Sequence, residues 1–382
     1  TPISGQGGTT SDVNVGDYAL SESGGPSGYA ASDWVCTGTG TQTGASVNLT
    51  EGETATCTIT NDDIAPTLSL VKTVTTDDGG TAVPTDWSLL ADGGNAGSHS
   101  GDGGFGVMNV MVGTYALSES DGPSGYTPSD WVCTGTGAQT GASIELTEGE
   151  TAVCTIDNDD IAPTLSLVKS VVNDDGGAAV AADWLLSAAG PTPTSGQGGF
   201  AVTNVNVGDY ALSESGGPAG YAASDWVCTG TGTQTAASVN LTEGQSAVCT
   251  ITNDDIAPLL TVVKQVMNIP DGEFCFSLTG TQSESFCITT EQNEGQEGGT
   301  LPAGNYSLTE TSTGSFKLVA ESCDNGDSPG DLNLNPGDDV TCTFVNGADL
   351  AVPVNNPVAL IMLILMMLAT GMYFRPAVLR RF

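Results

Sequence analysis

Three of the four lysines in this chain occupy equivalent places in a repeated sequence, each at the end of a short apolar run. Lys72 and Lys169 close the run TLSLVK, and Lys264 closes LLTVVK. Alternate residues of a β-strand share one face, so each lysine shares a face with two leucine or valine residues of its run. If that face points into a core, the amine is buried with them. Burial disfavours the charged form of an amine and favours a neutral nucleophile.

A buried ammonium needs a partner, and the same alternation offers a glutamate and an asparagine in each of these repeats. The glutamate shares a face with a tyrosine and a leucine of the YALSES-type segment. The asparagine shares a face with a cysteine of the last apolar segment. The candidate clusters are Lys72, Glu119 and Asn158; Lys169, Glu214 and Asn253; and Lys264, Glu310 and Asn346. The first repeat keeps Glu22 and Asn61 but has no first-strand lysine.

The elements that must position these residues recur with a period near 95. Trp34, Trp131 and Trp226 lie 97 and 95 positions apart. Such a unit is too long for a solenoid repeat, so each copy is expected to be a complete domain. The expected organisation is a truncated repeat 1 (1–66), repeat 2 (67–163), repeat 3 (164–258), a divergent repeat 4 (259–348) and a C-terminal tail (349–382).

Composition and short alternating runs predict an all-β fold. Gly, Asp and Pro separate the runs, and seven short strands in under 100 residues indicate a two-sheet, Ig-like β-sandwich. In repeat 2 the expected strands are 67–74, 85–91, 104–111, 114–119, 129–135, 143–147 and 151–158.

The ten cysteines are spaced as pairs, one pair in each of the first three repeats and two in the fourth. No C-x-x-C motif occurs, which argues against zinc and thioredoxin-like chemistry. The spacing predicts disulfides formed in an oxidising compartment. The expected pairs are Cys36 with Cys57, Cys133 with Cys154, Cys228 with Cys249, Cys275 with Cys287, and Cys323 with Cys342.

The segment YALSESGGPSGY resembles the Y-x-L-x-E-x-x-x-P-x-G-Y box of Cna-B/SpaA-like domains, the prealbumin-like repeats of bacterial surface proteins. The resemblance covers about 1–348. It implies that a first-strand lysine and a last-strand asparagine can join in an intramolecular isopeptide bond, assisted by the glutamate of the box. A protonated glutamate would polarise the asparagine amide while the neutral amine attacks it. The alternative is a buried Lys–Glu ion pair with the asparagine as a hydrogen-bond partner.

The chain carries 45 acidic and 7 basic residues, a net charge of −38, so a nucleic-acid partner is not expected. No cofactor is expected, although the acidic pairs Asp77-Asp78 and Asp174-Asp175 could contribute to calcium sites or simply form turns. His99 is the only histidine, so no Ser-His-Asp or Cys-His arrangement can recur from repeat to repeat. The protein is therefore not expected to be an enzyme, apart from autocatalytic isopeptide formation within its own repeats.

The tail combines a short motif beginning at Val352 and Pro353, an apolar run (358–374) and the basic residues Arg375, Arg380 and Arg381. A 17-residue helix reaches about 26 Å, slightly less than the roughly 30 Å hydrocarbon core of a membrane. The arginines favour a cytoplasmic C-terminus. The order resembles exosortase-type IPTL-CTERM or PEP-CTERM sorting signals, which implies a processing protease as a partner. A simple single-pass membrane anchor is the alternative.

These features predict a structural or adhesive bacterial cell-surface stalk, anchored or sorted through its tail. Near-identical repeats favour spacing or avidity over one unique site. The alternative is a surface adhesin module that binds a specific glycan or protein, with an extracellular ligand that the sequence does not identify. Thr1 falls inside a repeat, so we expect further sequence before it.

Overall fold

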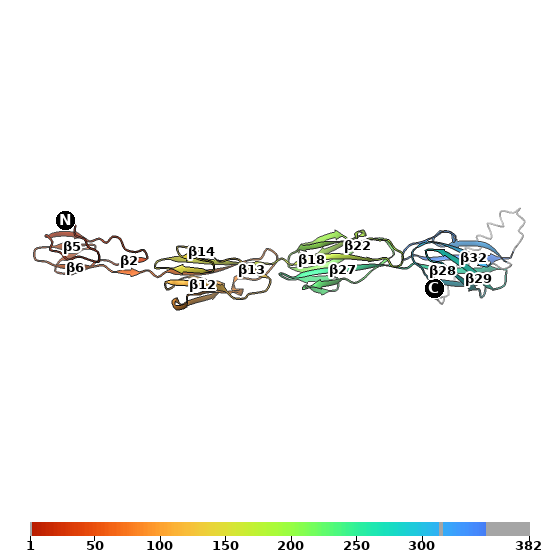
Figure 1. Cartoon of the computed structure of the whole chain (residues 1–382), viewed down its shortest axis with the longest axis horizontal. Coiled ribbons are helices and arrows are strands. Elements are labelled where there is room, and N and C mark those ends of the chain that lie inside the picture. The colour runs from red at the N-terminus through yellow and green to blue at the C-terminus, as the bar shows by residue number, and fades with distance from the viewer. Residues whose placement is uncertain (1, 313–315, 349–382) are drawn as a thin grey trace. The chain divides into compact units, whose positions relative to one another are not determined.

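The structure is a computed structural model that describes residues 2–312 and 316–348. One compact unit consists of the residues up to Ala162 together with Thr242–Gly244, and the other consists of the remaining residues. The described residues form β-strands and three short 3-10 turns, with no α-helix among them. Figure 1 labels a few strands of each repeat and colours the chain from red to blue in sequence order. The all-β class expected from composition is therefore confirmed.

Repeat 2 forms two five-stranded sheets with ten strands in all. One sheet has the order β10-β9-β12-β16-β15. The other has the order β11-β8-β17-β13, with β14 also paired to β17. The strands are β8 (Thr67–Thr75), β9 (Ser88–Asp92), β10 (Ser98–Asp102), β11 (Gly104–Asn109), β12 (Gly113–Glu119), β13 (Tyr126–Pro128), β14 (Val132–Gly135), β15 (Ala138–Gln139), β16 (Ser143–Leu146) and β17 (Thr151–Asp160).

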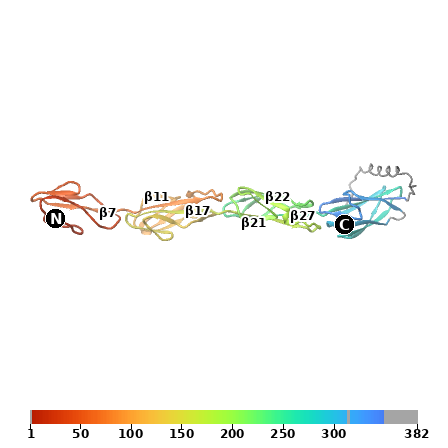
Figure 2. The same cartoon turned by 90° about the horizontal axis from the view of Figure 1, so that it is seen from above.

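The first and last strands of repeat 2 are parallel neighbours. Leu70 lies opposite Cys154, and Lys72 lies opposite Ile156. Figure 2 labels β11 and β17, the two strands between which β8 lies in this sheet. This pairing brings the two ends of the repeat's sequence into one sheet.

Repeat 3 repeats this topology, and its first strand again pairs in parallel with its last. Its strands are β18 (Thr164–Val172), β19 (Trp184–Ala189), β20 (Thr194–Gln197), β21 (Gly199–Asn204), β22 (Gly208–Gly216), β23 (Tyr221–Ala223), β24 (Val227–Gly230), β25 (Thr233–Thr235), β26 (Ser238–Leu241) and β27 (Ser246–Asp255).

Repeat 4 has two four-stranded sheets, β31-β28-β35-β33 and β30-β29-β32-β34. Its first and last strands are also parallel neighbours. Its strands are β28 (Leu259–Met267), β29 (Glu273–Gly280), β30 (Glu284–Thr289), β31 (Glu294–Thr300), β32 (Gly304–Ser312), β33 (Lys317–Cys323), β34 (Leu332–Leu334) and β35 (Asp339–Gly347).

Repeat 1 forms only small sheets among its described residues, ordered β1-β5-β4, β2-β7 and β3-β6. Residues 2–15 contain no strand. The strands are β1 (Gly16–Ala19), β2 (Tyr29–Ala31), β3 (Val35–Gly38), β4 (Thr41–Gln42), β5 (Ser46–Leu49), β6 (Ala55–Thr58) and β7 (Asn61–Asp63).

The core of each complete repeat lies between its two sheets and is built from alternate strand residues. In repeat 2, Leu68 and Leu70 of β8 are buried against Tyr115 and Leu117 of β12. Trp131 belongs to the same cluster, and Cys133 packs against that cluster. Each buried leucine contributes on the order of 2 kcal/mol through burial of apolar surface. Lys72 follows these leucines on the same face of β8 and is buried with them.

Candidate functional site

Each complete repeat brings its lysine, glutamate and asparagine together from three strands. In repeat 2, Lys72 lies on β8 and Asn158 on the neighbouring strand β17, while Glu119 ends β12 in the opposing sheet. Lys72 Nζ lies 3.0 Å from Glu119 Oε2. The parallel pairing places Lys72 and Asn158 on neighbouring strands, and the packing of the two sheets brings Glu119 to Lys72.

Repeats 3 and 4 show that the glutamate bridges the other two groups. In repeat 3, Lys169 Nζ lies 2.6 Å from Glu214 Oε2, and Asn253 Nδ2 donates a 2.8 Å hydrogen bond to Glu214 Oε1. In repeat 4, Lys264 Nζ lies 3.2 Å from one oxygen of Glu310, and Asn346 Nδ2 donates to the other at 2.7 Å. One carboxylate thus contacts both the amine and the amide.

The three amines are enclosed, because each lysine side chain is 0% exposed. Desolvation by burial lowers the pKa of Lys72, Lys169 and Lys264, and the facing glutamate offsets part of this effect. Loss of the proton, which gives the nucleophilic neutral amine, therefore costs less free energy here than it does in water.

An aromatic ring covers each amine from the start of the second strand of the repeat or from the residue just before it. The Nζ atoms lie 5.0 Å from the ring centroid of Trp87, 4.7 Å from that of Trp184 and 4.7 Å from that of Phe274. A ring at this distance stabilises an ammonium and excludes water from it. Sequence analysis did not identify these rings as part of the site, although each begins an alternating apolar run that could have indicated it.

The amide oxygens of the three asparagines are buried acceptors with no hydrogen-bond partner among the described residues. A buried acceptor left unsatisfied typically costs about 1–3 kcal/mol. Rotation of the asparagine amide by 180° exchanges its oxygen and its NH2 group, which differ little in shape. A protonated glutamate is then able to donate a hydrogen bond to that oxygen. The arrangement therefore has the groups needed to polarise the amide carbon.

The clusters differ in how well their glutamates are shielded. The Glu119 and Glu214 side chains are 14% and 12% exposed, whereas that of Glu310 is 1% exposed. Burial raises the pKa of Glu310, against the opposing effect of Lys264. Beside Glu119 lies a hollow of about 480 Å³, lined in part by Trp131, Gln139 and Ile156.

Repeat 1 holds only part of this cluster. Asn61 Nδ2 donates a hydrogen bond to Glu22 Oε1, and both residues are exposed. Residues 1–66 include no lysine that would complete the cluster.

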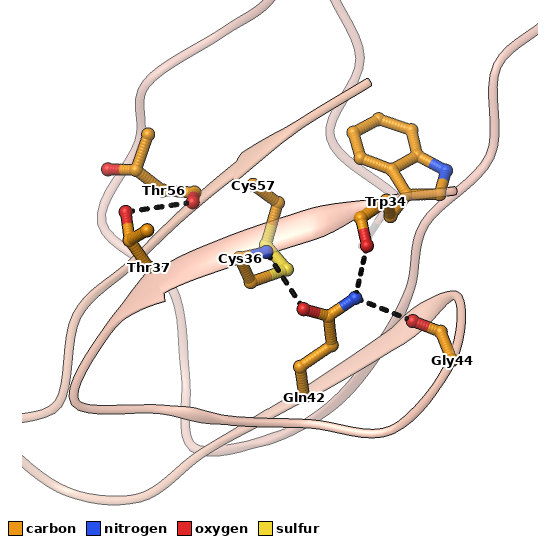
Figure 3. Close-up of a disulfide and its surroundings, with 7 residues drawn as sticks. All are labelled: Trp34, Cys36, Thr37, Gln42, Gly44, Thr56 and Cys57. Carbon is orange, nitrogen blue, oxygen red and sulfur yellow. Dashed lines mark hydrogen bonds between the residues drawn. A yellow bond between two sulfur atoms is a disulfide. The ribbon is translucent and has the colours of Figure 1, made fainter. Parts of the chain in front are cut away.

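All five expected disulfides are present. Every pair joins residues that lie directly opposite each other on neighbouring antiparallel strands, such as Cys36 on β3 and Cys57 on β6. Figure 3 shows Gln42 beside this disulfide. Its Oε1 accepts from the Cys36 backbone N–H, and its Nε2 donates to the Trp34 and Gly44 carbonyls.

The same glutamine contacts recur in repeats 2 and 3 through Gln139 and Gln234. Each glutamine holds the backbone at the tryptophan carbonyl and at the N–H of the cysteine two residues later. Sequence analysis missed this role, which the invariant glutamine of the TGTQT and TGAQT segments could have indicated.

The acidic pairs form turns anchored by a third carboxylate. Asp160 accepts hydrogen bonds from the backbone N–H groups of Asp78 and Gly80 at 3.1 and 2.6 Å. Asp255 accepts equivalent bonds in repeat 3. Asp77, Asp159 and Asp160 come close enough to share a cation, so both the expectation of no cofactor and the calcium alternative stay untested.

Residues Val352, Pro353, Arg375, Arg380 and Arg381 and the apolar run between them lie outside the described residues. Among residues 2–312 and 316–348, no helix is both long enough and apolar enough to cross a membrane.

The repeated unit and its sandwich correspond to a known family. The sequence profile of the SpaA-type prealbumin-like fold domain matches residues 1–59, 63–156, 160–251 and 255–344. The chain belongs to this family. The resemblance drawn from the YALSES box is therefore confirmed. No curated protein sequence matches the chain.

Solved structures with a similar fold include the TIE protein of Bacillus anthracis, at 14% identity and a TM-score of 0.45, covering 87% of this chain and 68% of that chain. The pilus adhesin SpaC of Lactobacillus rhamnosus GG has 11% identity and a TM-score of 0.27, covering 88% and 56%. The major pilin subunit of Bacillus cereus has 9% identity and a TM-score of 0.27, covering 74% and 99%. This chain thus spans little more than half of the adhesin, and the family assignment rests on the sequence profile.

Proposed function

We propose that this protein is a structural stalk of the bacterial cell surface whose prealbumin-like repeats are covalently cross-linked inside. The observation that carries the proposal is the buried Lys–Glu–Asn cluster, which occurs in all three complete repeats with the same strand origins. Five disulfides add a second kind of cross-link and fit an oxidising location. Repeated internal cross-linking suits a part that must resist unfolding and proteolysis outside the cell.

The cross-linking step joins Lys Nζ to Asn Cγ within a repeat. The neutral amine attacks the amide carbon, the Cγ–Nδ2 bond breaks, and the departing NH2 group takes up the one proton that the amine loses and leaves as ammonia. The glutamate carries the proton from the amine to the departing nitrogen. Its protonated form donates a hydrogen bond to the amide oxygen while that oxygen bears negative charge. The proposed pairs are Lys72 with Asn158, Lys169 with Asn253, and Lys264 with Asn346.

Intact mass of the reduced whole chain tests this step. Each bond removes one ammonia, so each linked repeat lowers the mass by about 17 Da. We expect the loss from all three repeats and its absence from a repeat that carries Glu→Gln at Glu119, Glu214 or Glu310. A chain of unaltered mass would leave the clusters as ion pairs and remove the covalent part of the proposal.

The location is the second part of the proposal. A tail that spans the cytoplasmic membrane, with Arg375, Arg380 and Arg381 inside, would hold the repeats outside until a processing protease cleaves it. Fractionation of cells that express the whole chain should recover it from the envelope or the medium. Recovery of the chain in the cytoplasm, with free thiols, would contradict this part.

A further inference from the structure

The additional disulfide of repeat 4 lies on the outer face of its sheet. Cys275 of β29 alternates with Phe274 and Phe276, which are buried in the core, so the Cys275 side chain points the opposite way. Cys287 lies directly opposite Cys275 on the neighbouring strand β30. Cys275 is partly exposed and Cys287 is exposed. The two sulfurs are therefore on the solvent side of this sheet.

The other disulfides of the complete repeats are enclosed. In repeats 2 and 3, one cysteine of the pair is 0% exposed and the other packs against the core. In repeat 4, Cys323 and Cys342 are 8% and 0% exposed. Because an attacking thiolate must reach a sulfur atom directly, access helps to decide which disulfide exchanges. Cys275–Cys287 is therefore the pair in these three repeats that is most open to an external thiol.

The place of the pair in the sheet decides which sulfur is attacked. A thiolate displaces a disulfide sulfur from the side opposite the leaving sulfur. The bond crosses from β29 to β30, and β30 is the edge strand of the order β30-β29-β32-β34 among the described residues. Attack on Cys287 thus comes from the sheet edge. Attack on Cys275 would come from over β32, where Thr311 donates a 3.1 Å hydrogen bond to the Cys275 carbonyl. Cys287 is the accessible sulfur, and Cys275 is the leaving group.

A carboxylate sets the charge beside these sulfurs. Glu273 lies two residues before Cys275 on the same face of β29, and it is exposed. A carboxylate oxygen of Glu273 and the two sulfurs all lie within 4.8 Å of one another. Its negative charge repels an anionic reagent and attracts a cationic one, with part of the effect screened by salt. The site therefore favours a thiol whose other groups are neutral or positive.

We propose that Cys275–Cys287 is a thiol-exchange site, at which an external thiol with a neutral or positive group becomes attached to repeat 4. The external thiolate forms a bond to Cys287 Sγ while the Cys287–Cys275 bond breaks. The electron pair of that bond leaves on Cys275 Sγ, which takes up a proton from water. One disulfide replaces another, so no separate oxidant or reductant is needed. The step does not depend on isopeptide formation, and repeat 4 keeps its core disulfide Cys323–Cys342.

The test exposes the whole chain to three small thiols of similar size: cysteamine, which is cationic, mercaptoethanol, which is neutral, and mercaptoethanesulfonate, which is anionic. Each is used at the same thiolate concentration, the reaction is stopped by acid, free cysteines are blocked with a maleimide, and peptide mass spectrometry locates each adduct. We expect the adduct on Cys287 and the free thiol on Cys275. This exchange should be at least about tenfold faster than opening of Cys228–Cys249. Cys323–Cys342 should stay closed, which excludes unfolding of repeat 4 as the cause.

A pair of variants measures the charge preference. Glu273→Gln should raise the exchange rate with mercaptoethanesulfonate about threefold relative to the rate with cysteamine, because one negative charge beside the sulfurs is removed. Asp339→Asn is the matched control, since it removes an exposed negative charge from the same repeat. Asp339 begins β35 opposite Leu259, at the other end of β28 from the turn that leads into Glu273. The control should leave the ratio of the two rates unchanged.

The outcomes that overturn the proposal are distinct. Opening of Cys228–Cys249 or Cys323–Cys342 as fast as Cys275–Cys287 would remove the distinction on which the site rests. Absence of exchange at Cys275–Cys287, or an adduct that forms mainly on Cys275, would also overturn it. Equal rate ratios in the Glu273→Gln and Asp339→Asn chains would overturn the preference for neutral or cationic thiols.

Discussion

Repeats 3 and 4 build the same polar cluster inside different cores. Repeat 3 has Trp184 over its lysine and a second buried tryptophan, Trp226, beside its disulfide. Repeat 4 has Phe274 over its lysine and the exposed Glu321 in place of the second tryptophan. The cluster is thus independent of the tryptophan that marks the first three repeats.

The lost tryptophan is replaced by aromatic packing in the centre of repeat 4. Phe276 stacks on Phe286 at 5.5 Å and meets Phe344 edge-on at 5.1 Å between ring centroids. Phe276 and Phe344 correspond to Leu186 and Ile251 of repeat 3. This packing accompanies the near-complete burial of Glu310, which is 1% exposed against 12% for Glu214. The comparison teaches that the same three groups can be held in sites of different polarity.

The largest expected effect comes from removing the lysine. In a chain whose bond formation is blocked by Asn253→Ala and Asn346→Ala, Lys264→Ala leaves Glu310 buried without its cation, and breaking a buried ion pair typically costs about 3–5 kcal/mol. Lys169→Ala should cost less, because Glu214 keeps more contact with water. Calorimetry of the whole chain measures both, with each transition assigned by its variant. Equal losses in the two repeats would show that the difference in burial has no energetic consequence.

The additional disulfide of repeat 4 sharpens the comparison. Cys275 and Cys287 close a loop with a sequence separation of 12, so Cys→Ser at both should lower the unfolding free energy of repeat 4 by about 2–3 kcal/mol. The repeat 3 transition serves as the internal control and should not move. If repeat 4 is unaffected, its phenylalanine core suffices without this cross-link.

Loss of the bridging glutamine should have a smaller effect in repeat 3. Gln234→Ala removes hydrogen bonds to the backbone at Trp226, Cys228 and Ala236. A loss of about 1–3 kcal/mol is expected, because the freed groups are partly buried. Thermal unfolding measures it, with repeat 4 as the unchanged reference. A shift of both transitions would contradict a local role.

The pH dependence should distinguish the two clusters when bond formation is blocked by Asn253→Ala and Asn346→Ala. The pKa of Glu310 is raised, so folded repeat 4 holds more protons than the unfolded chain above pH 4.5 and loses stability as the pH rises through this window. The pKa of both Lys264 and Lys169 is lowered, so both repeats gain stability as the pH rises toward 10.5.

Melting temperatures across these two ranges measure the effect in each repeat. Glu310→Gln should remove the acidic-side loss in repeat 4 and leave its alkaline gain in place. Persistence of the acidic-side loss in that variant would assign it to another group.

Removal of divalent cations should have the smallest effect. Asp255 anchors the turn of repeat 3 through backbone N–H groups, and Asp271 does so in repeat 4 through those of Gln292 and Asn293. Since these carboxylates already have donors, a chelator should move neither transition by more than about 1 °C. A clear fall in the repeat 3 transition alone would instead support a calcium site at its acidic pair.

Strand alternation in the sequence was enough to group the lysines, glutamates and asparagines, because a buried face repeats every second residue. The cysteine spacing was enough to pair the sulfurs. The short strands β10, β13 and β15 of repeat 2 were not expected, because two to five residues carry too little alternation to be recognised.

The rings of Trp87 and Trp184 over the amines depend on which strand pairs with which, and periodicity within a single strand does not contain that information. The tail prediction concerns residues 349–382, which lie outside the described part of the chain.

The parallel pairing of first and last strands also imposes an order on folding. In repeats 2, 3 and 4 the opening strand finds its neighbour only after the whole of the repeat has been synthesised. Contacts between such distant segments form slowly, because a long loop must close first. Each repeat must therefore stay incompletely closed while it is being made. With neighbours of nearly identical sequence, the cell must keep one repeat's opening strand from joining the closing strand of another.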